Sequence, residues 1–228
     1  MSSRARWAES RLRYTFKDPG LLEQALTHRS ASRNNNERLE YLGDSFLSFA
    51  IARRLYAARP EDTEGDLSRA RAALVREATL AAIGQQLRLD EEIVLGAGEL
   101  RSGGAQRGAV LADAVEALIG AVLLDGGTEA AEALIDFLFA EQIAALPDAA
   151  TLKDAKTRLQ EWLQGRGLKL PAYGVESVHG RDHEQTFVVS CEVTEKNAHT
   201  TGQGPSRRRA EQEAAAAMLA VLTGERDS

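Results

Sequence analysis

The segment NERLEYLGDS, residues 36–45, decides how this 228-residue chain is interpreted. Apolar residues recur at spacings of three and four from Leu39 to Leu55, which predicts a helix through the segment. Residues three, four and seven apart are neighbours on a helix, so Glu37, Glu40 and Asp44 form one acidic stripe. Like charges at this spacing destabilise a helix by roughly 0.2–0.5 kcal/mol per pair. The stripe therefore requires a counter-charge.

An acidic stripe is ordinarily a solvated face, but the other sides of this helix argue against that explanation. Apolar side chains lie on both sides of it: Tyr41, Leu47 and Ile51 on or beside the acidic side, and Leu39, Leu42, Phe46 and Phe49 opposite. A helix that is apolar nearly all round is normally buried. We therefore expect this helix to be enclosed by the rest of the fold.

A second predicted helix carries two further acids in an apolar setting. Every residue from Ala109 to Leu124 is apolar except Asp113, Glu116 and Gly120, and the two acids, three apart, share a face. An unpaired ionised carboxylate in such a helix costs on the order of several kcal/mol. Both acids therefore need partners.

Two arrangements would satisfy these acids. In the first, arginine side chains pair with them. In the second, the two helices face each other and offer Glu40, Asp44, Asp113 and Glu116 to a hard divalent cation. Mg²⁺ prefers oxygen ligands, and His28 is the one histidine near these segments in the sequence, so zinc is disfavoured.

The pattern of the whole chain divides it into two domains. Helical spacing recurs in residues 21–26, 39–55, 67–87, 109–124 and 130–143, with glycines at 20, 65, 84, 103–104 and 126–127 as turns or helix ends. Beyond a short linker come one helical face, extended segments at 172–178, 185–193 and 199–202, and an alanine-rich helix. We expect an all-α domain at 4–146, a linker at 147–151 and an α+β domain of α-β-β-β-α order at 152–225.

Charge and cysteine content restrict the partners and the compartment. The net charge is −6, which at first argues against a nucleic-acid partner. However, residues 1–147 hold 17 basic and 22 acidic side chains, whereas residues 148–228 hold 11 and 12. A single cysteine, Cys191, excludes an internal disulfide, fits a reducing cytoplasm and is expected to be a small apolar strand residue.

The same sequence predicts neither export nor a membrane segment. The basic N-terminus is followed by polar residues instead of an apolar signal region. The longest apolar run, residues 109–124, is short for a bilayer and contains two acids. We expect a cytoplasmic protein.

Segment 36–45 closely resembles the signature of the ribonuclease III family. Four other segments match further blocks of the family in the same order: THRS (27–30), EGDLSR (64–69), GELRSGG (98–104) and LADAVEA (111–117). With the second domain, the resemblance covers nearly the whole chain and is to the short bacterial form. It implies a Mg²⁺-dependent endoribonuclease of double-stranded RNA, with Mn²⁺ as a substitute metal and no nucleotide or organic cofactor. The family acts as a homodimer with one catalytic centre per subunit.

The resemblance also implies roles for individual acids. Glu40, Asp113 and Glu116 resemble the family's metal ligands. Asp44 and Glu116 resemble the residues essential for hydrolysis, and Glu37 and Glu64 resemble supporting acids near the cleavage site. The implied products carry 5′-phosphate and 3′-hydroxyl ends with short 3′ overhangs, because two sites of the dimer cut opposite strands.

Two positions depart from the family pattern. Tyr41 stands where the family commonly has a phenylalanine that inserts into the partner subunit, and an ordinary core aromatic within one chain is an equal alternative. Residues 105–109, AQRGA, replace a more basic and aromatic stretch, which affects expected RNA contacts and not the metal ligands.

The second domain resembles a double-stranded RNA-binding domain. Three segments stand where that family contacts RNA: KTRLQE (156–161), DHEQ (182–185) and GPSRRRAE (204–211). Ser206 can cap the last helix, so that its N–H groups, Arg207 and Arg208 converge on phosphates. The expected RNA-binding residues are Thr157, Gln160, Glu161, His183, Ser206, Arg207 and Arg208, whereas Leu159 and Trp162 are expected in the core.

The leading hypothesis is a homodimeric, Mg²⁺-dependent, double-strand-specific endoribonuclease that processes ribosomal precursor RNA and other structured transcripts. One rival is an RNA-binding regulator with an inactive nuclease fold, against which the four intact carboxylates argue. Another is an acidic helical interaction protein, against which the placed segments of the second domain argue. The net charge does not exclude RNA, because a bound metal would reverse the sign of the acidic region locally.

Overall fold

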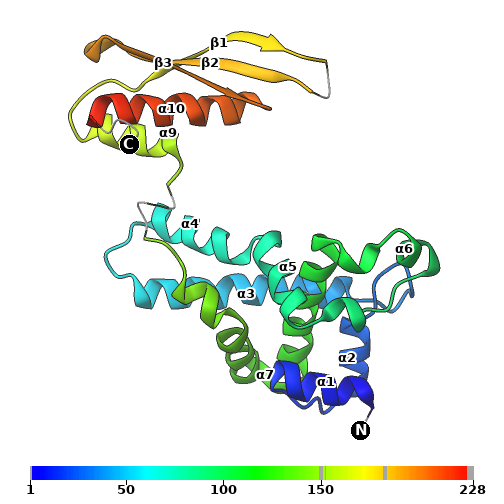
Figure 1. Cartoon of the computed structure of the whole chain (residues 1–228). Coiled ribbons are helices and arrows are strands. Elements are labelled where there is room, and N and C mark those ends of the chain that lie inside the picture. Colours follow the sequence, from blue (N-terminus) through cyan, green and yellow to red (C-terminus); the bar gives the residue numbers. More distant parts are fainter. Residues whose placement is uncertain (1, 149–150, 152, 182–183, 225–228) are drawn as a thin grey trace. The chain divides into compact units, whose positions relative to one another are not determined.

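The computed structural model describes residues 2–148, 151, 153–181 and 184–224 (Figure 1). The chain forms two compact units, residues 1–149 and 150–228, and each is described by itself. His183, one of the expected RNA-binding residues, lies outside the described residues.

The described part of the first unit is helical, as predicted. Its helices are α1 (Ser3–Leu12), α2 (Pro19–Ala25), α3 (Glu37–Ala58), α4 (Glu64–Val75), α5 (Glu77–Gln86), α6 (Ala97–Arg101) and α7 (Gly108–Ala144). Two short 3₁₀ turns, η1 (Leu89–Glu91) and η2 (Gly104–Gln106), connect them. The core lies along α7, whose residues from Val110 to Val122 are buried apart from the two acids.

Helices α3 and α7 cross at two glycines. A methyl group added to Gly43 would lie 1.8 Å from the carbonyl oxygen of Glu116, and one added to Gly120 would lie 2.2 Å from that of Leu39. No side chain fits between the two backbones at this point. Since Glu40 lies one turn from Gly43, the crossing brings an acid of α3 beside an acid of α7.

The long helix α7 is interrupted where the sequence predicts a turn. Gly127 has φ +81° inside the helix, a conformation that favours glycine. Just before it, the carboxylate of Asp125 accepts hydrogen bonds from the Tyr14 hydroxyl (2.7 Å) and the backbone N–H groups of Lys17 and Asp18 (2.8 Å each). These bonds fix the segment between α1 and α2 against the end of the buried half of α7.

Three local predictions need correction or completion. The helical pattern at 67–87 is two helices, because the backbone of Arg76 is extended (φ −68°, ψ 152°) between α4 and α5. Gly84 lies within α5 and not at its end, packed against Leu111. Helices α1 and α6 were not predicted, although Ser2 caps α1 by accepting a bond from the Ala5 N–H (3.1 Å).

The prediction that α3 is enclosed on all sides is wrong. One face, with Leu39, Leu47 and Ile51, is fully buried. The opposite face is open, and Tyr41 and Phe49 keep 77% and 60% of their surface exposed. The reason is that α7 covers one side of α3, while α4 only borders the aromatic side and leaves Tyr41, Phe49 and Tyr56 exposed.

The second unit has the predicted α-β-β-β-α order. Its elements are α9 (Ala155–Gln164), β1 (Ala172–His179), β2 (Thr186–Val193), β3 (Ala198–Gly204) and α10 (Arg207–Thr223), with the 3₁₀ turn η3 (Thr194–Lys196) between β2 and β3. The strands form an antiparallel sheet in the order β1-β2-β3. Both helices lie on the same face of the sheet (Figure 1).

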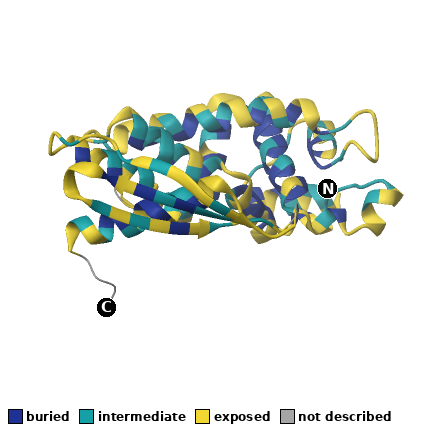
Figure 2. Ribbon diagram, turned by 90° about the horizontal axis from the view of Figure 1, so that it is seen from above, coloured by how far each residue is buried: buried dark blue, intermediate teal, exposed yellow. Residues whose placement is uncertain are grey.

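The core of this unit lies between the sheet and its two helices. Val189, Cys191 and Val193 of β2 are buried and alternate with less buried residues (Figure 2). Cys191 and Val193 pack with Leu159 of α9 and Met218 of α10. Burial raises the pKa of the Cys191 thiol, so the expectation that this cysteine is an apolar strand residue is confirmed. Among the described residues, no helix combines the length and apolar character needed to cross a membrane.

Candidate metal centre and RNA-binding surface

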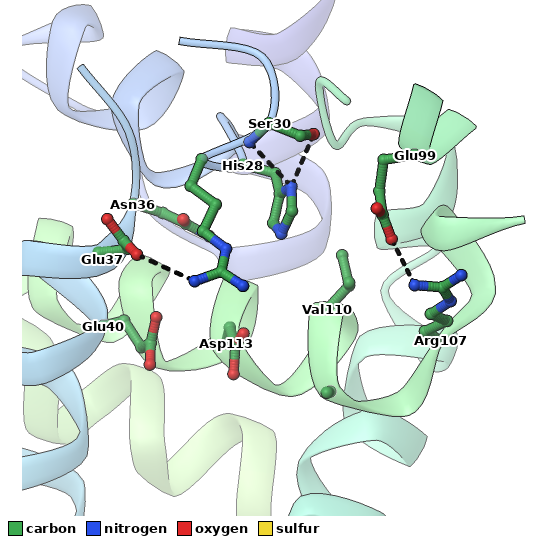
Figure 3. A pocket seen from close by; sticks show the side chains of 11 residues that line it. His28, Ser30, Asn36, Glu37, Glu40, Glu99, Arg107, Val110 and Asp113 are labelled. Atoms are coloured by element: carbon green, nitrogen blue, oxygen red, sulfur yellow. Dashed lines mark hydrogen bonds and ion pairs between the residues drawn. The ribbon is translucent and has the colours of Figure 1, made fainter. Parts of the chain in front are cut away.

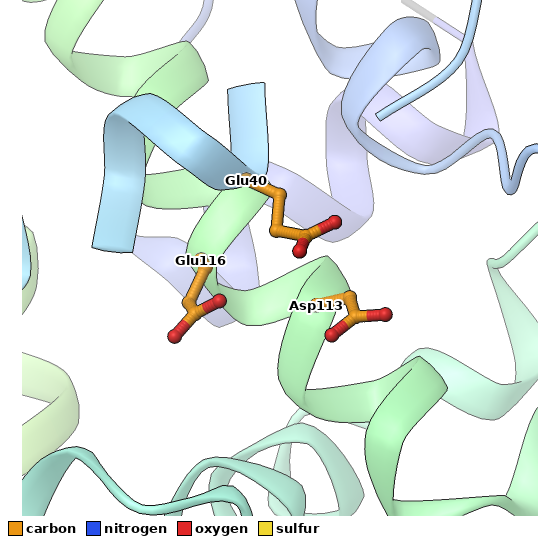
Figure 4. A group of neighbouring side chains, drawn as sticks. All are labelled: Glu40, Asp113 and Glu116. Atoms are coloured by element: carbon orange, nitrogen blue, oxygen red, sulfur yellow. The ribbon is translucent and has the colours of Figure 1, made fainter. Parts of the chain in front are cut away.

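Three carboxylates meet where α3 and α7 cross. Glu40 projects from α3, and Asp113 and Glu116 project from α7 toward it (Figure 4). One carboxylate oxygen from each of the three lies within 4.8 Å of the others. The close approach at Gly43 and Gly120 and the three-residue spacing on α7 produce this cluster.

The cluster is partly buried, and among the described residues no basic side chain forms an ion pair with it. Burial, together with the negative charges of Asp44, Glu40 and Asp113, raises the pKa of Glu116 to about 8. Burial likewise raises the pKa of Glu40 and of Asp113. Among the described residues, no ion pair within 4.0 Å involves any of these three carboxylates. Arginine pairing, the first of the two alternatives, is therefore absent from the cluster as described.

These properties fit a hard divalent cation. Three carboxylate oxygens at this spacing match the ligand type that Mg²⁺ and Mn²⁺ accept, and partial exposure leaves room for metal-bound water. A cation would also remove the repulsion that raises the pKa of Glu116.

The other expected acids lie at different distances from the cluster. Asp44, one turn beyond Glu40 on α3, is exposed and close enough to raise the pKa of Glu116. Glu37 lies at the start of α3 and forms an ion pair with Arg29 (3.7 Å). Glu64, in contrast, is not part of this cluster. It lines a second pocket of about 610 Å³ with Phe49 and Tyr56.

A pocket of about 560 Å³ adjoins the carboxylate cluster (Figure 3). Glu40 and Asp113 line one side of it. His28, Arg29 and Arg107 also line it, although none of these three is predicted from the sequence as a site residue. His28 and Arg29 could have been predicted from their position in the THRS block, residues 27–30.

The structure excludes one of the two alternatives for Tyr41. Its exposed fraction of 77% excludes a core aromatic within one chain. Phe49 and Tyr56 are also exposed on the same helix, at 60% and 76%.

The second unit brings the starts of α9 and α10 together. Glu211 of α10 accepts hydrogen bonds from Lys156 Nζ of α9 (2.6 Å) and from Arg207 Nε (2.9 Å). Ser206 accepts from the Arg209 N–H (3.3 Å), so the predicted cap of α10 is confirmed. Arg208 is exposed at the same helix start. The positive ends of two helices and several cations therefore lie on one surface.

The remaining residues of α9 divide between surface and core. Leu159 is fully buried and Trp162 packs against the core, as predicted. Thr157 and Gln160 are partly exposed, and Glu161 is exposed and paired with Lys153 (2.7 Å).

Comparisons with known proteins cover both units. Residues 18–143 match the family model described as ribonuclease-III-like, and residues 155–222 match the double-stranded RNA binding motif. The chain is 49% identical to Ribonuclease 3 of Nitrosococcus oceani, covering 95% of this chain and 94% of that protein. It is 54% identical to Ribonuclease 3 of Delftia acidovorans, covering 93% of each. A crystal structure of the ribonuclease III nuclease domain from Campylobacter jejuni, 39% identical, aligns with a TM-score of 0.60 over 64% of this chain and 100% of that domain.

A nuclease domain joined to a double-stranded RNA-binding domain defines the class of this protein, which is an endoribonuclease specific for double-stranded RNA. Two relatives that are 49% and 54% identical to this chain align with 95% and 93% of it, so both alignments include the two domains. The chain belongs to the ribonuclease III family, and the resemblance seen in its sequence blocks is confirmed.

Proposed function

We propose that this enzyme is a homodimer that uses Mg²⁺, with Mn²⁺ as a substitute, to hydrolyse phosphodiester bonds of double-stranded RNA. Its products carry 5′-phosphate and 3′-hydroxyl ends with short 3′ overhangs. It acts in the cytoplasm on ribosomal RNA precursors and on structured mRNA and tRNA transcripts, without a nucleotide or organic cofactor. The catalytic and dimerisation domain spans 4–146, the linker 147–151 and the RNA-binding domain 152–225. The observation that carries the proposal is the unpaired carboxylate cluster beside a pocket.

In this proposal the acids have separate tasks. Glu40, Asp113 and Glu116 hold the metal through carboxylate oxygens. A bound Mg²⁺ supplies a lower pKa for its bound water and stabilises charge on the phosphate. Asp44, exposed beside the cluster, accepts a hydrogen bond from the attacking water and so orients it. Glu37 supports the site through its ion pair with Arg29.

The exposed aromatic face of α3 is the proposed dimer surface. Tyr41 projects from it, and the pocket lined by Phe49, Tyr56 and Leu67 is a mostly apolar recess on the same side of the helix pair. The nuclease domain of ribonuclease III from Campylobacter jejuni is described as structurally flexible in a region involved in dimer formation. Glu64 lines that pocket, so we propose that it supports cleavage from the dimer surface and not from its own chain's cluster.

Sedimentation equilibrium tests the dimer. We expect about twice the chain mass of 24.7 kDa at concentrations at which the enzyme cleaves RNA. A monomeric mass at those concentrations would contradict the proposal.

The proposed reaction is tested on a long RNA duplex of defined sequence. With Mg²⁺ we expect cuts in both strands that are offset toward the 3′ ends. The 5′ ends should be directly ligatable because they carry phosphate. Chelation of the metal should stop the reaction. Cleavage that persists in excess chelator, or products with 3′-phosphate ends, would reject the mechanism.

The proposed RNA contacts of the second domain lead to a prediction for Arg207 and Arg208. Replacing both with alanine should weaken duplex binding and reduce its salt dependence, because fewer phosphate contacts release fewer counterions. We expect the slope of log affinity against log salt to fall by roughly 1–2 units. A titration of a labelled RNA duplex at several salt concentrations measures both quantities.

The matched control replaces Lys169 and Lys196 with alanine. This double variant makes the same change in net charge, but both residues lie at the β2–β3 end of the domain, where Glu195 accepts a bond from the Lys169 N–H (2.7 Å). It should leave the salt slope close to that of the wild type. Equal losses in both variants would mean that total charge, and not the capped start of α10, determines binding.

A further inference from the structure

The pocket beside the carboxylate cluster has a wall of hydrogen-bond donors that do not bind the metal in the proposed chemistry and have no assigned contact with the substrate. This wall is formed by the loop between α2 and α3, at His28 and Arg29. Glu40 and Asp113 line the same pocket of about 560 Å³. The donors and the acids therefore border one cavity. Among the described residues, neither His28 nor Arg29 forms an ion pair with Glu40 or Asp113.

Hydrogen bonds fix the proton of the neutral His28 ring on one nitrogen. Ser30 Oγ accepts from the Gly96 N–H (2.9 Å), which leaves its own hydrogen for His28 Nδ1 at 2.8 Å. The Ser30 N–H also donates to Nδ1 (3.2 Å). Nδ1 is thus an acceptor, so the neutral ring carries its hydrogen on Nε2. Figure 3 shows this second nitrogen directed into the pocket, toward Asp113.

The loop that carries these donors is held by its backbone. The His28 N–H donates to the Val94 carbonyl (3.0 Å), and the Val94 N–H donates to the Leu26 carbonyl (2.8 Å). A methyl group added to Gly96 would lie 2.2 Å from the Ser30 carbonyl oxygen, so two backbones are in direct contact here. The His28 ring and the backbone at Arg29 are therefore positioned before any ligand binds.

Arg29 is available for a stronger partner. Its ion pair with Glu37 is long, at 3.7 Å, and the two side chains keep 71% and 54% of their surface exposed. Exposed pairs of this kind contribute little to stability. A guanidinium group binds a phosphate through two parallel N–H bonds, which a solvated carboxylate 3.7 Å away does not satisfy.

We propose that His28 Nε2–H and the Arg29 guanidinium form a binding subsite for one phosphate of the RNA strand, next to the phosphate that is cleaved. This inference rests on the proposed function, because it assigns the two walls of one pocket to the metal and to the substrate backbone. The fixed loop sets the register of the strand relative to the carboxylates. Arg29 is a substrate-binding residue, and Ser30 and Gly96 are positioning residues for His28.

The test combines Arg29→Ala with RNA duplexes in which one phosphate at a time, near the cut, is a neutral methylphosphonate. In the wild type, one such duplex should be cleaved roughly 10- to 100-fold more slowly, as expected for a lost hydrogen-bonded ion pair. Arg29→Ala should cleave the unmodified duplex more slowly by a similar factor. The cleavage rate of Arg29→Ala should not fall further with that one modified duplex, because the guanidinium that would bind this phosphate is already absent.

Three controls keep the outcomes distinct. Arg33→Ala removes an exposed arginine of the same loop that does not line the pocket, and it should behave as the wild type. Arg29→Lys keeps the charge and should recover part of the rate. The charge of Arg29 also acts on Glu40 and Asp113, so its loss changes their affinity for Mg²⁺. Saturating Mg²⁺ should therefore not restore the rate of Arg29→Ala, whereas a loss caused only by altered metal affinity would be recovered at saturation.

Multiplicative losses for Arg29→Ala and every modified duplex would overturn the subsite while leaving the nuclease activity established. Wild-type cleavage rates in Arg29→Ala would also overturn it. A wild-type enzyme that does not cut duplex RNA with Mg²⁺ would overturn the proposed function, and the subsite with it.

Discussion

Replacing Glu116 with glutamine is expected to reduce cleavage of duplex RNA by at least about 10³-fold, since a metal ligand supplies several kcal/mol of transition-state stabilisation. The substitution removes one charge and almost no volume. Glu116 has its pKa raised to about 8 by burial and by the neighbouring acids, so its charge is stabilised only when a cation is present. Single-turnover cleavage of a defined duplex at saturating Mg²⁺ measures the loss.

The RNA affinity of Glu116→Gln should remain close to that of the wild type, because the substitution leaves the proposed cationic contacts at Arg29, Arg207 and Arg208 in place. The matched control is Glu129→Gln, the same change at an exposed acid of α7 beyond the Gly127 break. It should cleave normally. Undiminished cleavage by Glu116→Gln would exclude the carboxylate cluster as the metal site.

Metal-free stability gives a second readout for the same variant. The folded pKa of Glu116, about 8, lies above its ordinary value of 4.5, so the folded state binds more protons between these values. Stability of the wild type without metal therefore falls as the pH rises through this window. Glutamine has no such charge, so Glu116→Gln should be more stable than the wild type above pH 8, by about 1–2 kcal/mol after discounting for solvent screening. Denaturant unfolding in chelator at pH 5 and pH 8.5 measures the difference.

Lower stability of Glu116→Gln at pH 8.5 would mean that the carboxylate is structurally satisfied, and would contradict the metal-site interpretation. The pH dependence also separates loss of activity through unfolding from loss of a ligand.

Replacing Gly43 with alanine is expected to lower the free energy of unfolding by about 2–4 kcal/mol, at or above the usual range for overpacking. The added methyl group would lie 1.8 Å from the Glu116 carbonyl oxygen, and a backbone group cannot rotate away as a flexible side chain can. The helices must separate, and Glu40 and Glu116 separate with them. We expect lower stability, measured by denaturant unfolding. We also expect weaker Mg²⁺ binding, measured as a higher Mg²⁺ concentration at half-maximal rate.

Gly98→Ala is the control for this prediction. Gly98 lies in helix α6, and a methyl group there meets nothing within 4 Å. Since alanine is favoured over glycine in helices by up to about 1 kcal/mol, this variant should be neutral or slightly stabilised. If Gly43→Ala is as stable and active as Gly98→Ala, the α3–α7 crossing does not hold the metal ligands together.

The spacing of apolar and acidic residues was sufficient to predict most elements and the central acids. Glu40, Asp113 and Glu116 were predicted to lie together because each stands on a largely apolar helix. An ionised carboxylate on such a helix is poorly hydrated and needs a partner. Periodicity reports which residues share a face, and it predicted α3, both halves of α7 and the three strands.

Periodicity does not report what covers a face. It therefore wrongly predicted the aromatic side of α3 to be enclosed, although Phe49 is 60% exposed. Nor does it show backbone contacts between distant segments. Gly43 and Gly120 stand 77 positions apart, and Gly96 contacts the loop at Ser30 from a distance of 66 residues. Such contacts determine that Glu64 lies outside the cluster and that Arg29 lies beside it. Only the structure shows these two positions.

The central claim is that Glu40, Asp113 and Glu116 bind the cation that cleavage requires. It is tested most directly by diffraction from crystals of the full chain soaked in Mn²⁺, with anomalous scattering used to locate the ion. We predict an anomalous peak within about 2.0–2.3 Å of a carboxylate oxygen from each of the three residues, and loss of that peak in Glu116→Gln. A peak elsewhere, or none at the cluster under conditions in which Mn²⁺ supports cleavage, would contradict the account.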